Sequence, residues 1–339
     1  MQNQVTTFQD ALDTRFFAPL RRTRTRRIGV ELEFPVWSRT PGTATDFAAV
    51  HTATDDFLSR FPFSAQVRDD EGNIYRATDP DTGDELSFDC SYNTLEISFG
   101  PDESLTKTHR RFTTYYTALQ ESLADVMGYL ESTSIYCVER GERYINFAPV
   151  PLRDYLQLGS VVGEYWDGAA KIHRKCLISP QPSDVAWLRP FKFEDLTQRG
   201  TVEFRSVCEQ PVREAFSSSA FHAGLAERVA KLSELLAGDT ILYGHGYGAV
   251  ELRSLMIRRD WPSFIDRKAL SAQLHRILDV AEEGLVRRGF GEETLLAPLR
   301  RRADTLTSPA REHLTRLEGG ESIESIAIDY GSTEEKRHA

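Results

Sequence analysis

The fold prediction for this chain starts from the stretch Ile28-Gly-Val-Glu-Leu-Glu-Phe-Pro-Val36. Side chains at positions i and i+2 of a β-strand lie on the same face. An extended segment here carries Glu31 and Glu33 on one face, with Val30 and Phe34 on the other. The pattern therefore predicts a strand over residues 27–37 that has one charged face and one apolar face.

A second segment, Phe88-Asp-Cys-Ser-Tyr-Asn-Thr-Leu-Glu-Ile-Ser98, holds Asp89 and Glu96 and is also predicted to form a strand. One strand that alternates acidic and apolar residues is usually only half exposed. Several such strands together indicate a sheet face on which carboxylates repel one another unless cations lie between them. Oxygen-only ligand sets suit Mg²⁺ or Mn²⁺, and Mg²⁺ held by carboxylates usually also binds substrate phosphates.

A third segment, Gly200-Thr-Val-Glu-Phe-Arg-Ser206, places Glu203 and Arg205 on one predicted strand face. Val202 and Phe204 are expected on the opposite, apolar face. An arginine beside a carboxylate cluster is well suited to bind phosphate, because its planar fork donates two parallel hydrogen bonds.

The three segments resemble those of the glutamate–cysteine ligase family, the carboxylate–amine ligases related to glutamine synthetase. Members carry a Glu-x-Glu on an early strand, then an Asp and a Glu seven residues apart, then a Glu-x-Arg, in the order seen here. Residues 93–101, 201–211 and 281–292 also look like family phrases. The resemblance runs from about Arg27 to about Leu317 and covers most of the chain.

The resemblance implies an ATP-dependent ligase that joins a carboxylate to an amine through an acyl phosphate, with glutamate and cysteine as the default substrates and glutathione biosynthesis as the setting. It implies two or three Mg²⁺ ions, or Mn²⁺, held by Glu31, Glu33, Asp89, Glu96 and Glu203. Glu203 and Arg205 are the implied catalytic residues, with Arg205 on the γ-phosphoryl group. Apart from the resemblance, the basic run of residues 21–27 has three readings: a solvated lead-in to the first strand, an anionic-substrate patch or a nucleic-acid patch. Because the run directly precedes the Glu-x-Glu strand, its last residue, Arg27, is the candidate for contacting phosphate.

The middle of the chain departs from the family pattern, since residues 137–189 hold no clear copy of the family's Gln-x-His-like phrase. His173 is the nearest substitute for that ligand, and Arg174 and Lys171 are the candidates for binding a substrate carboxylate. This leaves open a ligase with a different amine acceptor in a specialised biosynthetic pathway. A metal-dependent phosphohydrolase or nuclease, and a non-catalytic binding protein on the same fold, are the alternatives from other classes.

The composition of the chain limits the classes of partner that it is expected to bind. The chain has 339 residues, of which 40% are hydrophobic and 27% charged, and a formal net charge of −10. Such a charge disfavours nucleic acid and anionic membranes as partners of the whole protein. The N-terminus lacks an apolar signal core, and no apolar run approaches the length of a membrane span. The four cysteines are scattered, so a cytoplasmic location is expected. The oligomeric state is left open.

The order of elements indicates an α+β fold, with a curved, mainly antiparallel sheet and helices on its outer face as the resemblance implies. A single ligase domain is expected, with a sheet-rich part over 20–210, a helical part over 211–317 and a mobile tail over 318–339. Helices are expected over 6–19, 46–60, 102–130, 211–237 and 265–288, the last capped by Gly289 and Gly291. Short strands are expected at 65–68 and 73–77, residues 151–196 are expected to be irregular, and residues 244–248 to connect two helices.

Overall fold

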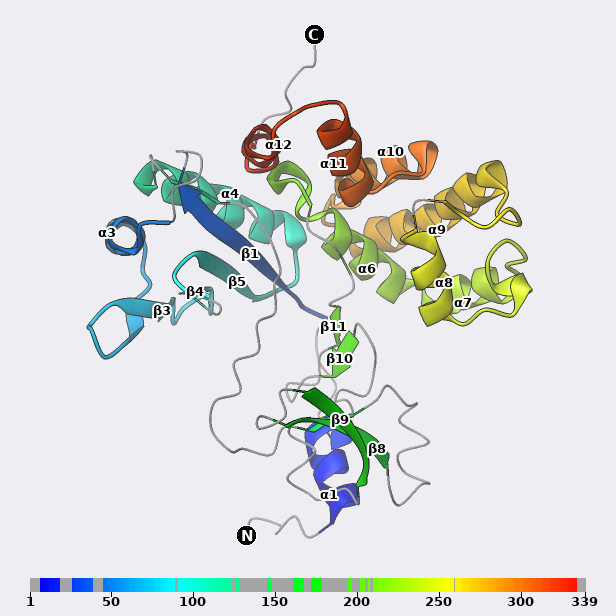
Figure 1. Cartoon of the computed structure of the whole chain (residues 1–339), viewed down its shortest axis with the longest axis horizontal. Helices are drawn as coiled ribbons and strands as arrows, with labels where there is room; N and C mark the ends of the chain where they lie inside the picture. The colour runs from blue at the N-terminus through cyan, green and yellow to red at the C-terminus, as the bar shows by residue number, and fades with distance from the viewer. Residues whose placement is uncertain are drawn as a thin grey trace. The chain divides into compact units, whose positions relative to one another are not determined.

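The structure is a computed structural model that describes residues 7–18, 26–38, 45–88, 91–123, 126–128, 145–147, 161–167, 172–178, 194–196, 202–204, 207, 210–258 and 260–333. The chain divides into two compact units (Figure 1). The larger unit joins Arg26–Ser132 to Cys208–Ala339. The smaller unit joins Met1–Thr25 to Thr133–Val207.

An open antiparallel sheet is the centre of the larger unit, with the strand order β2-β3-β4-β5-β1-β6. The strands are β1 (Ile28–Ser38), β2 (Ala65–Arg68), β3 (Ile74–Thr78), β4 (Glu85–Phe88), β5 (Thr94–Asp102) and β6 (Val126–Gly128). The predicted strand over 27–37 is confirmed as β1, which pairs with β5 on one side and β6 on the other. Mixed helix and antiparallel sheet confirm the predicted α+β class.

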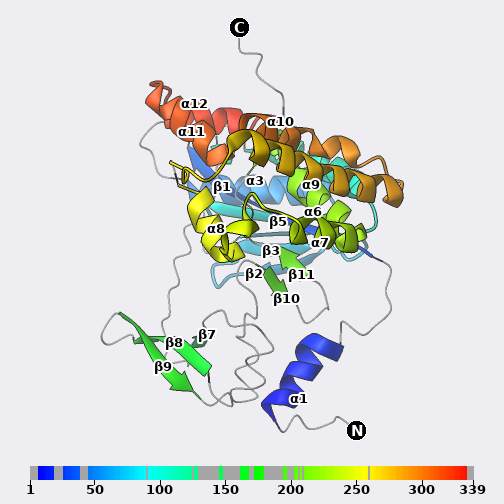
Figure 2. The ribbon, with the colours of Figure 1, turned by 90° about the vertical axis from the view of Figure 1, so that its right-hand side faces the viewer.

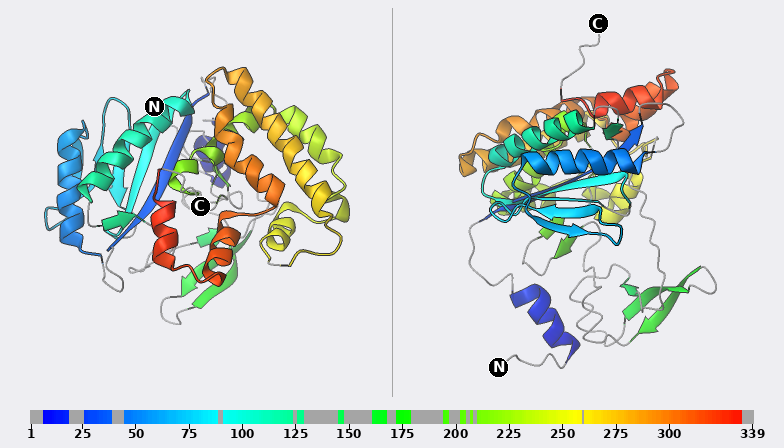
Figure 3. Two further views of the ribbon diagram at one scale, coloured as in Figure 1. Left: turned by 90° about the horizontal axis from the view of Figure 1, so that it is seen from above. Right: turned by 90° about the vertical axis from the view of Figure 1, so that its left-hand side faces the viewer.

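Two helices lie on the same face of this sheet (Figure 3). Helix α3 (Phe47–Arg60) begins after Asp46, whose carboxylate accepts hydrogen bonds from the backbone N–H groups of Ala48 and Ala49. Helix α4 (Leu105–Ser122) begins after Ser104, whose hydroxyl accepts from the N–H of Lys107. Both starts are N-caps that satisfy backbone donors. The predicted helix over 102–130 is wrong beyond Ser122, because the chain turns there and then pairs with β1 as β6.

The main core lies between the apolar face of the sheet and α4. Phe34 of β1 stacks on Phe112 at 6.1 Å between ring centroids and packs on Tyr116 at 5.4 Å. Leu95 and Ile97 of β5 are also fully buried in this cluster. The alternation of β1 and β5 thus fixes which face is covered by helices and which face carries the glutamates.

The C-terminal part of the larger unit is helical, as predicted. Its elements are η3 (Val212–Glu214), α6 (Ser217–Glu227), α7 (Val229–Ala237), η4 (Tyr243–His245), α8 (Ala249–Met256), α9 (Arg267–Arg288), η5 (Glu293–Leu296), α10 (Ala297–Thr305), α11 (Pro309–Glu318) and α12 (Ile323–Tyr330). The predicted helix over 211–237 is interrupted at Arg228, whose φ of −130° is not helical. The predicted cap of α9 is confirmed, since Gly289 has a φ of 75°, a conformation that favours glycine. Residues 244–248 connect α7 to α8 through η4, as predicted.

Helices α6 and α9 run side by side at unusually close range (Figure 2). A Cβ atom placed on Gly284 of α9 would lie 1.9 Å from the carbonyl oxygen of Gly224 of α6. A Cβ atom placed on Gly224 would lie 2.1 Å from the carbonyl oxygen of Ala281. The two glycines are therefore required by the approach of the two backbones.

The N-terminal sheet and the C-terminal helices share one core. The ring of Phe216 lies 5.6 Å from that of Phe112 on α4. The carboxylate of Glu292, which is fully buried, accepts hydrogen bonds at 2.7 Å from the N–H of Leu105 and from the Nε–H of Arg288. Segments far apart in the sequence are thus held together at the start of α4.

The far C-terminus differs from the predicted mobile tail. Residues Ile323–Tyr330 form α12, in which Ile326, Ala327 and Tyr330 are buried. Their spacing places them on one helical face. The hydroxyl of Tyr116 also donates a hydrogen bond at 2.7 Å to the carbonyl oxygen of Gly331.

The smaller unit contains α1 (Phe8–Leu12), continued by η1 (Asp13–Phe17), a three-stranded sheet and a two-stranded sheet. The three strands are β7 (Ile145–Phe147), β8 (Val161–Asp167) and β9 (Ile172–Ile178), and the other two are β10 (Glu194–Leu196) and β11 (Val202–Phe204). The prediction that residues 151–196 are irregular is therefore wrong. Val161-Val-Gly-Glu-Tyr-Trp-Asp167 is rich in the β-branched and aromatic residues that favour strands.

No helix within the described ranges is both long enough and apolar enough to cross a membrane.

Candidate functional site: a carboxylate face on the sheet

The charged face of β1 continues across two neighbouring strands. The register of β1 and β5 places Glu33 opposite Glu96 and Glu31 opposite Ser98. The register of β4 and β5 places Glu85 opposite Ser98. Residues directly opposite each other in an antiparallel pair share a face of the sheet. Four glutamates from three strands therefore lie on the same face, here called the carboxylate face: Glu31, Glu33, Glu85 and Glu96.

This face is the one opposite the helices. The residues that alternate with the glutamates, such as Val30, Leu95 and Ile97, are buried in the core. Glu31 is exposed, whereas Glu33, Glu85 and Glu96 are partly buried. The sheet thus presents its carboxylates away from the core, where a polar ligand has access to Glu31.

Hydroxyl groups on the same face support two of the carboxylates. The Ser98 hydroxyl donates to a carboxylate oxygen of Glu96 at 2.6 Å, and the Thr78 hydroxyl donates to Glu85 at 3.1 Å. Hydrogen bonds of this kind hold a carboxylate in one orientation. Glu96 and Glu85 are therefore oriented by hydroxyl groups of their own face.

The spacing of the carboxylates suits shared binding of a cation. Directly opposite residues in an antiparallel pair have Cβ atoms about 4.5–5.5 Å apart, a separation that two glutamate side chains can bridge through one ion. Within the described parts of the chain, no three His, Cys, Asp or Glu side chains converge into a complete metal site. Mg²⁺ nevertheless requires few protein ligands, since it keeps waters and binds one or two carboxylates plus substrate phosphates. The Glu33–Glu96 pair fits that requirement.

The predicted strand from Asp89 to Glu96 is confirmed only in part, because Thr94–Glu96 belong to β5 but residues 91–93 do not form a strand. Ser91, Tyr92 and Asn93 form a turn between β4 and β5, closed by a hydrogen bond of 3.1 Å from the N–H of Thr94 to the carbonyl oxygen of Ser91. Serine and asparagine are typical turn residues, because their side chains bond to nearby backbone. Asp89 lies outside the described residues, so its membership of the cluster stays a prediction.

Tyr92 fixes this turn to the loop between β2 and β3. Its hydroxyl donates a hydrogen bond at 2.5 Å to Asp69, and its ring packs on His51 at 4.2 Å. The hydrogen bond from Tyr92, with further bonds from Asn73 and Glu71, lowers the pKa of Asp69 to about 2. Burial together with Asp69 raises the pKa of Tyr92 to about 12. The turn that precedes Glu96 is therefore held by a strong, charge-assisted contact.

The third predicted segment belongs to the smaller unit. Glu203 lies on β11 opposite Asp195 of β10, and its side chain is partly buried. Val202 and Phe204, the apolar residues expected on the face opposite Glu203, are each 47% exposed. The two-stranded ladder is too small to bury them by itself. Arg205 lies outside the described residues.

The predicted substrate residues lie in the same unit. The backbones of His173 and Arg174 are paired in β9, opposite Trp166 and Tyr165 of β8. Lys171 lies outside the described residues. Arg27 is exposed and directly precedes β1.

Sequence reasoning missed Glu85. The segment Glu85-Leu-Ser-Phe88 alternates polar and apolar residues, and its register with β5 puts Glu85 and Ser87 on the carboxylate face. That alternation is the signal by which it could have been found.

No known family model matches this chain, and no curated protein sequence matches it either.

Proposed function

We propose that this protein is an ATP-dependent carboxylate–amine ligase that forms an amide through an acyl phosphate, with glutamate and cysteine as the default substrates. The observation that carries the proposal is the register of β1 and β5, in which Glu33 lies opposite Glu96 and Glu31 follows on the same face. A sheet face with several carboxylates is a natural support for Mg²⁺ and a bound nucleotide phosphate. The proposed fold is a curved, glutamine-synthetase-like sheet with helices on its outer face, and the helix-covered face opposite the glutamates supports it.

The residues have separate roles in the proposed reaction. Glu31, Glu33 and Glu96 would hold two or three Mg²⁺ ions, or Mn²⁺, and Asp89 and Glu203 would complete the ligand set. The metal ions would neutralise phosphate charge as it develops during phosphoryl transfer. The guanidinium of Arg205 would bind the γ-phosphoryl group through two parallel hydrogen bonds, and Arg27 would contact phosphate from the start of β1.

The amine and the carboxylate must then be held for attack on the acyl phosphate. Arg174 and Lys171 are the proposed partners of a substrate carboxylate, and His173 is the proposed substitute for the ligand that the middle section lacks. Because those positions depart from the family pattern, an acceptor other than cysteine in a specialised biosynthetic pathway is the alternative within the same reaction class.

Amine-dependent release of ADP tests the activity. The purified protein would be given Mg²⁺, ATP, glutamate and a panel of amines that includes cysteine, and the amide product would be identified by mass spectrometry. The proposal expects ADP release that requires an amine. Full-rate phosphate release without an amine would favour a phosphohydrolase that uses the same carboxylates, and the absence of turnover with retained Mg²⁺–ATP binding would favour a binding protein.

Thermal melting tests the metal and nucleotide site separately from turnover. Wild-type protein is expected to gain melting temperature with Mg²⁺–ATP, whereas Glu203→Gln is expected to gain less because one charge has left the proposed metal ligand set. Arg205→Lys is expected to lower the rate nearly as much as Glu203→Gln, since lysine lacks the planar fork. Equal gains in wild type and Glu203→Gln would refute the metal assignment.

A further inference from the structure

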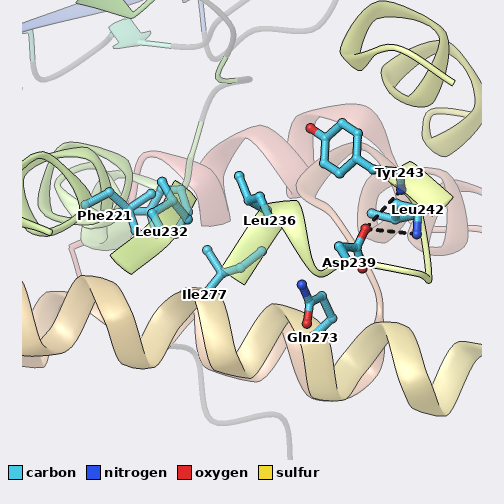
Figure 4. A pocket seen from close by; sticks show the side chains of 9 residues that line it. Phe221, Leu232, Leu236, Asp239, Leu242, Tyr243, Gln273 and Ile277 are labelled. Atoms are coloured by element: carbon cyan, nitrogen blue, oxygen red, sulfur yellow. Dashed lines mark hydrogen bonds between the residues drawn. The ribbon is translucent and has the colours of Figure 1, made fainter. Parts of the chain in front are cut away.

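A pocket of about 240 Å³ lies under α7, in the helical part of the larger unit (Figure 4). Its walls come from three helices and the η4 turn. Leu232 and Leu236 of α7 lie above it, Phe221 of α6 closes one side, and Ile277 of α9 lies below. No residue of α7 is fully buried, so the leucines of this helix cover a space that they do not fill.

The pocket contains one buried polar group without a partner. The Gln273 side chain of α9 is 2% exposed and lines the pocket, and its amide nitrogen has no hydrogen-bond partner. Figure 4 shows this nitrogen directed away from the backbone of α9, on the side of Leu236 and Asp239. Buried donors in native proteins are almost always paired, so an unpaired donor that lines a pocket is available to an acceptor on a ligand.

The neighbouring carboxylate determines which acceptor fits. Asp239 is buried at the same end of the pocket, and its oxygens already accept hydrogen bonds from the backbone N–H groups of Ile241, Leu242 and Tyr243 at 3.1, 3.0 and 2.9 Å. These bonds fix the η4 turn and use the carboxylate as a structural cap. Its negative charge disfavours a second anion nearby. The acceptor is therefore an uncharged oxygen.

We propose that this pocket binds a small neutral molecule with an apolar body of about six or seven heavy atoms, whose carbonyl oxygen accepts a hydrogen bond from the amide nitrogen of Gln273. Ketones, esters and uncharged amides share this chemistry. The leucine and isoleucine side chains bury the apolar body, and Gln273 orients the carbonyl. The pocket shares no residue with the carboxylate face, so it is a second site with its own ligand.

Hexan-2-one is a suitable probe, and hexanoate is its charged comparison. Both would be titrated into ¹³C-methyl-labelled full-length protein without ATP, Mg²⁺ or amine, while the methyl resonances of Leu232, Leu236 and Ile277 are followed. The proposal expects saturable shifts of these methyl groups with hexan-2-one, and at least tenfold weaker binding of hexanoate. Because no turnover is measured, the result is independent of the proposed ligase activity.

Two variants and a control locate the binding. Gln273→Leu keeps the size of the side chain but removes the donor, and is expected to weaken hexan-2-one binding at least tenfold. Leu236→Phe fills the pocket, leaves Gln273 in place, and is expected to abolish binding even if Gln273→Leu folds poorly. Val229→Phe is the matched control, because Val229 lies on α7 outside the pocket and is 62% exposed. Unsaturable shifts in wild type, undiminished binding in Leu236→Phe, or wild-type affinity in folded Gln273→Leu would overturn the proposal.

Discussion

The pairing of Glu33 with Glu96 sets two negative charges directly across an antiparallel ladder. Like charges in this position destabilise a sheet when no cation lies between them. Glu33→Gln removes one of these two charges and keeps the length of the side chain. The amine-dependent ADP release of this variant is expected to fall by about two powers of ten or more, as loss of a key electrostatic contact typically causes.

A matched control for this substitution is Glu121→Gln on α4. Glu121 is exposed and pairs with Arg60 at 2.6 Å, so its loss is expected to change both activity and stability little. Urea unfolding without metal and ADP assays with metal would be compared for the three proteins. A Glu33→Gln protein that is destabilised but fully active would assign Glu33 a structural role instead.

The contact between Tyr92 and Asp69 predicts a defined dependence of stability on pH. The pKa of Asp69 is lowered from 3.8 to about 2, so its contribution is present above the unfolded value and is lost as pH falls toward 2. The pKa of Tyr92 is raised from 10.0 to about 12, so its contribution is present below 10 and is lost as pH rises toward 12. Tyr92→Phe is expected to be destabilising between these limits.

Denaturant unfolding at a series of pH values checks this expectation, with Tyr247→Phe as the control because Tyr247 is exposed and lies between η4 and α8, away from Asp69 and Tyr92. The difference in unfolding free energy between wild type and Tyr92→Phe should be largest at neutral pH and should narrow at both extremes. A difference that is constant across the whole range would show that the ring packing on His51, rather than the hydrogen bond, provides the stability.

At the scale of elements, the crossing of α6 and α9 depends on glycine. Gly284→Ala would place a methyl group against the backbone of Gly224, so the helices must separate or bend. Overpacking of this kind is expected to lower the free energy of unfolding by about 1–3 kcal/mol or more. Gly238→Ala is the control, since its φ of −91° is ordinary and its nearest neighbour would be 3.8 Å away. Urea unfolding would measure the free energy of unfolding of both variants. An equal loss in Gly284→Ala and Gly238→Ala would contradict the close approach of α6 and α9.

Elements defined by local signals could be predicted from the sequence. Asp46 marks the start of α3, Gly289 marks the end of α9, and the alternation around Glu31 marks β1. The interruption at Arg228 could not be predicted, because the apolar spacing continues through it. The boundary between β4 and β5 was missed because acidic and apolar residues alternate on both sides of the turn.

The candidate site was predictable only in part, for a related reason. That Glu31 and Glu33 share a face follows from the period of a single strand. The register between β1, β4 and β5 places Glu33 opposite Glu96 and puts Glu85 on the same face. Local alternation within one strand gives no information about this register, so the sequence alone could not predict it. The exposed fractions of Val202 and Phe204 depend on what packs beside β11, and strand periodicity does not contain that information.

At the scale of the whole larger unit, Glu292 joins the last third of the chain to the start of α4. Glu292→Leu would leave the guanidinium of Arg288, which is 5% exposed, and the N–H of Leu105 without this acceptor. The loss is expected to be about 3–5 kcal/mol in unfolding free energy, as for other broken buried pairs. The double variant Arg288→Leu, Glu292→Leu is expected to recover part of it, because no buried charge is left alone. A double variant no more stable than Glu292→Leu would contradict this account.

The hydrogen bond from Tyr116 to Gly331 spans 215 residues of sequence. Translation at about 5–20 residues per second would separate the synthesis of its two ends by roughly 11–43 s. During that interval Phe112 and Phe99 have emerged, but Phe216, Ala281 and α12, which complete their surroundings, are made only later. A ribosome carrying the N-terminal sheet therefore displays an apolar helix–sheet surface for many seconds. Ribosome-bound chains in which the sheet and α4 have left the exit tunnel but α6, α9 and α12 have not been made are expected to be cleaved rapidly by protease, and the full-length released chain is expected to be protected.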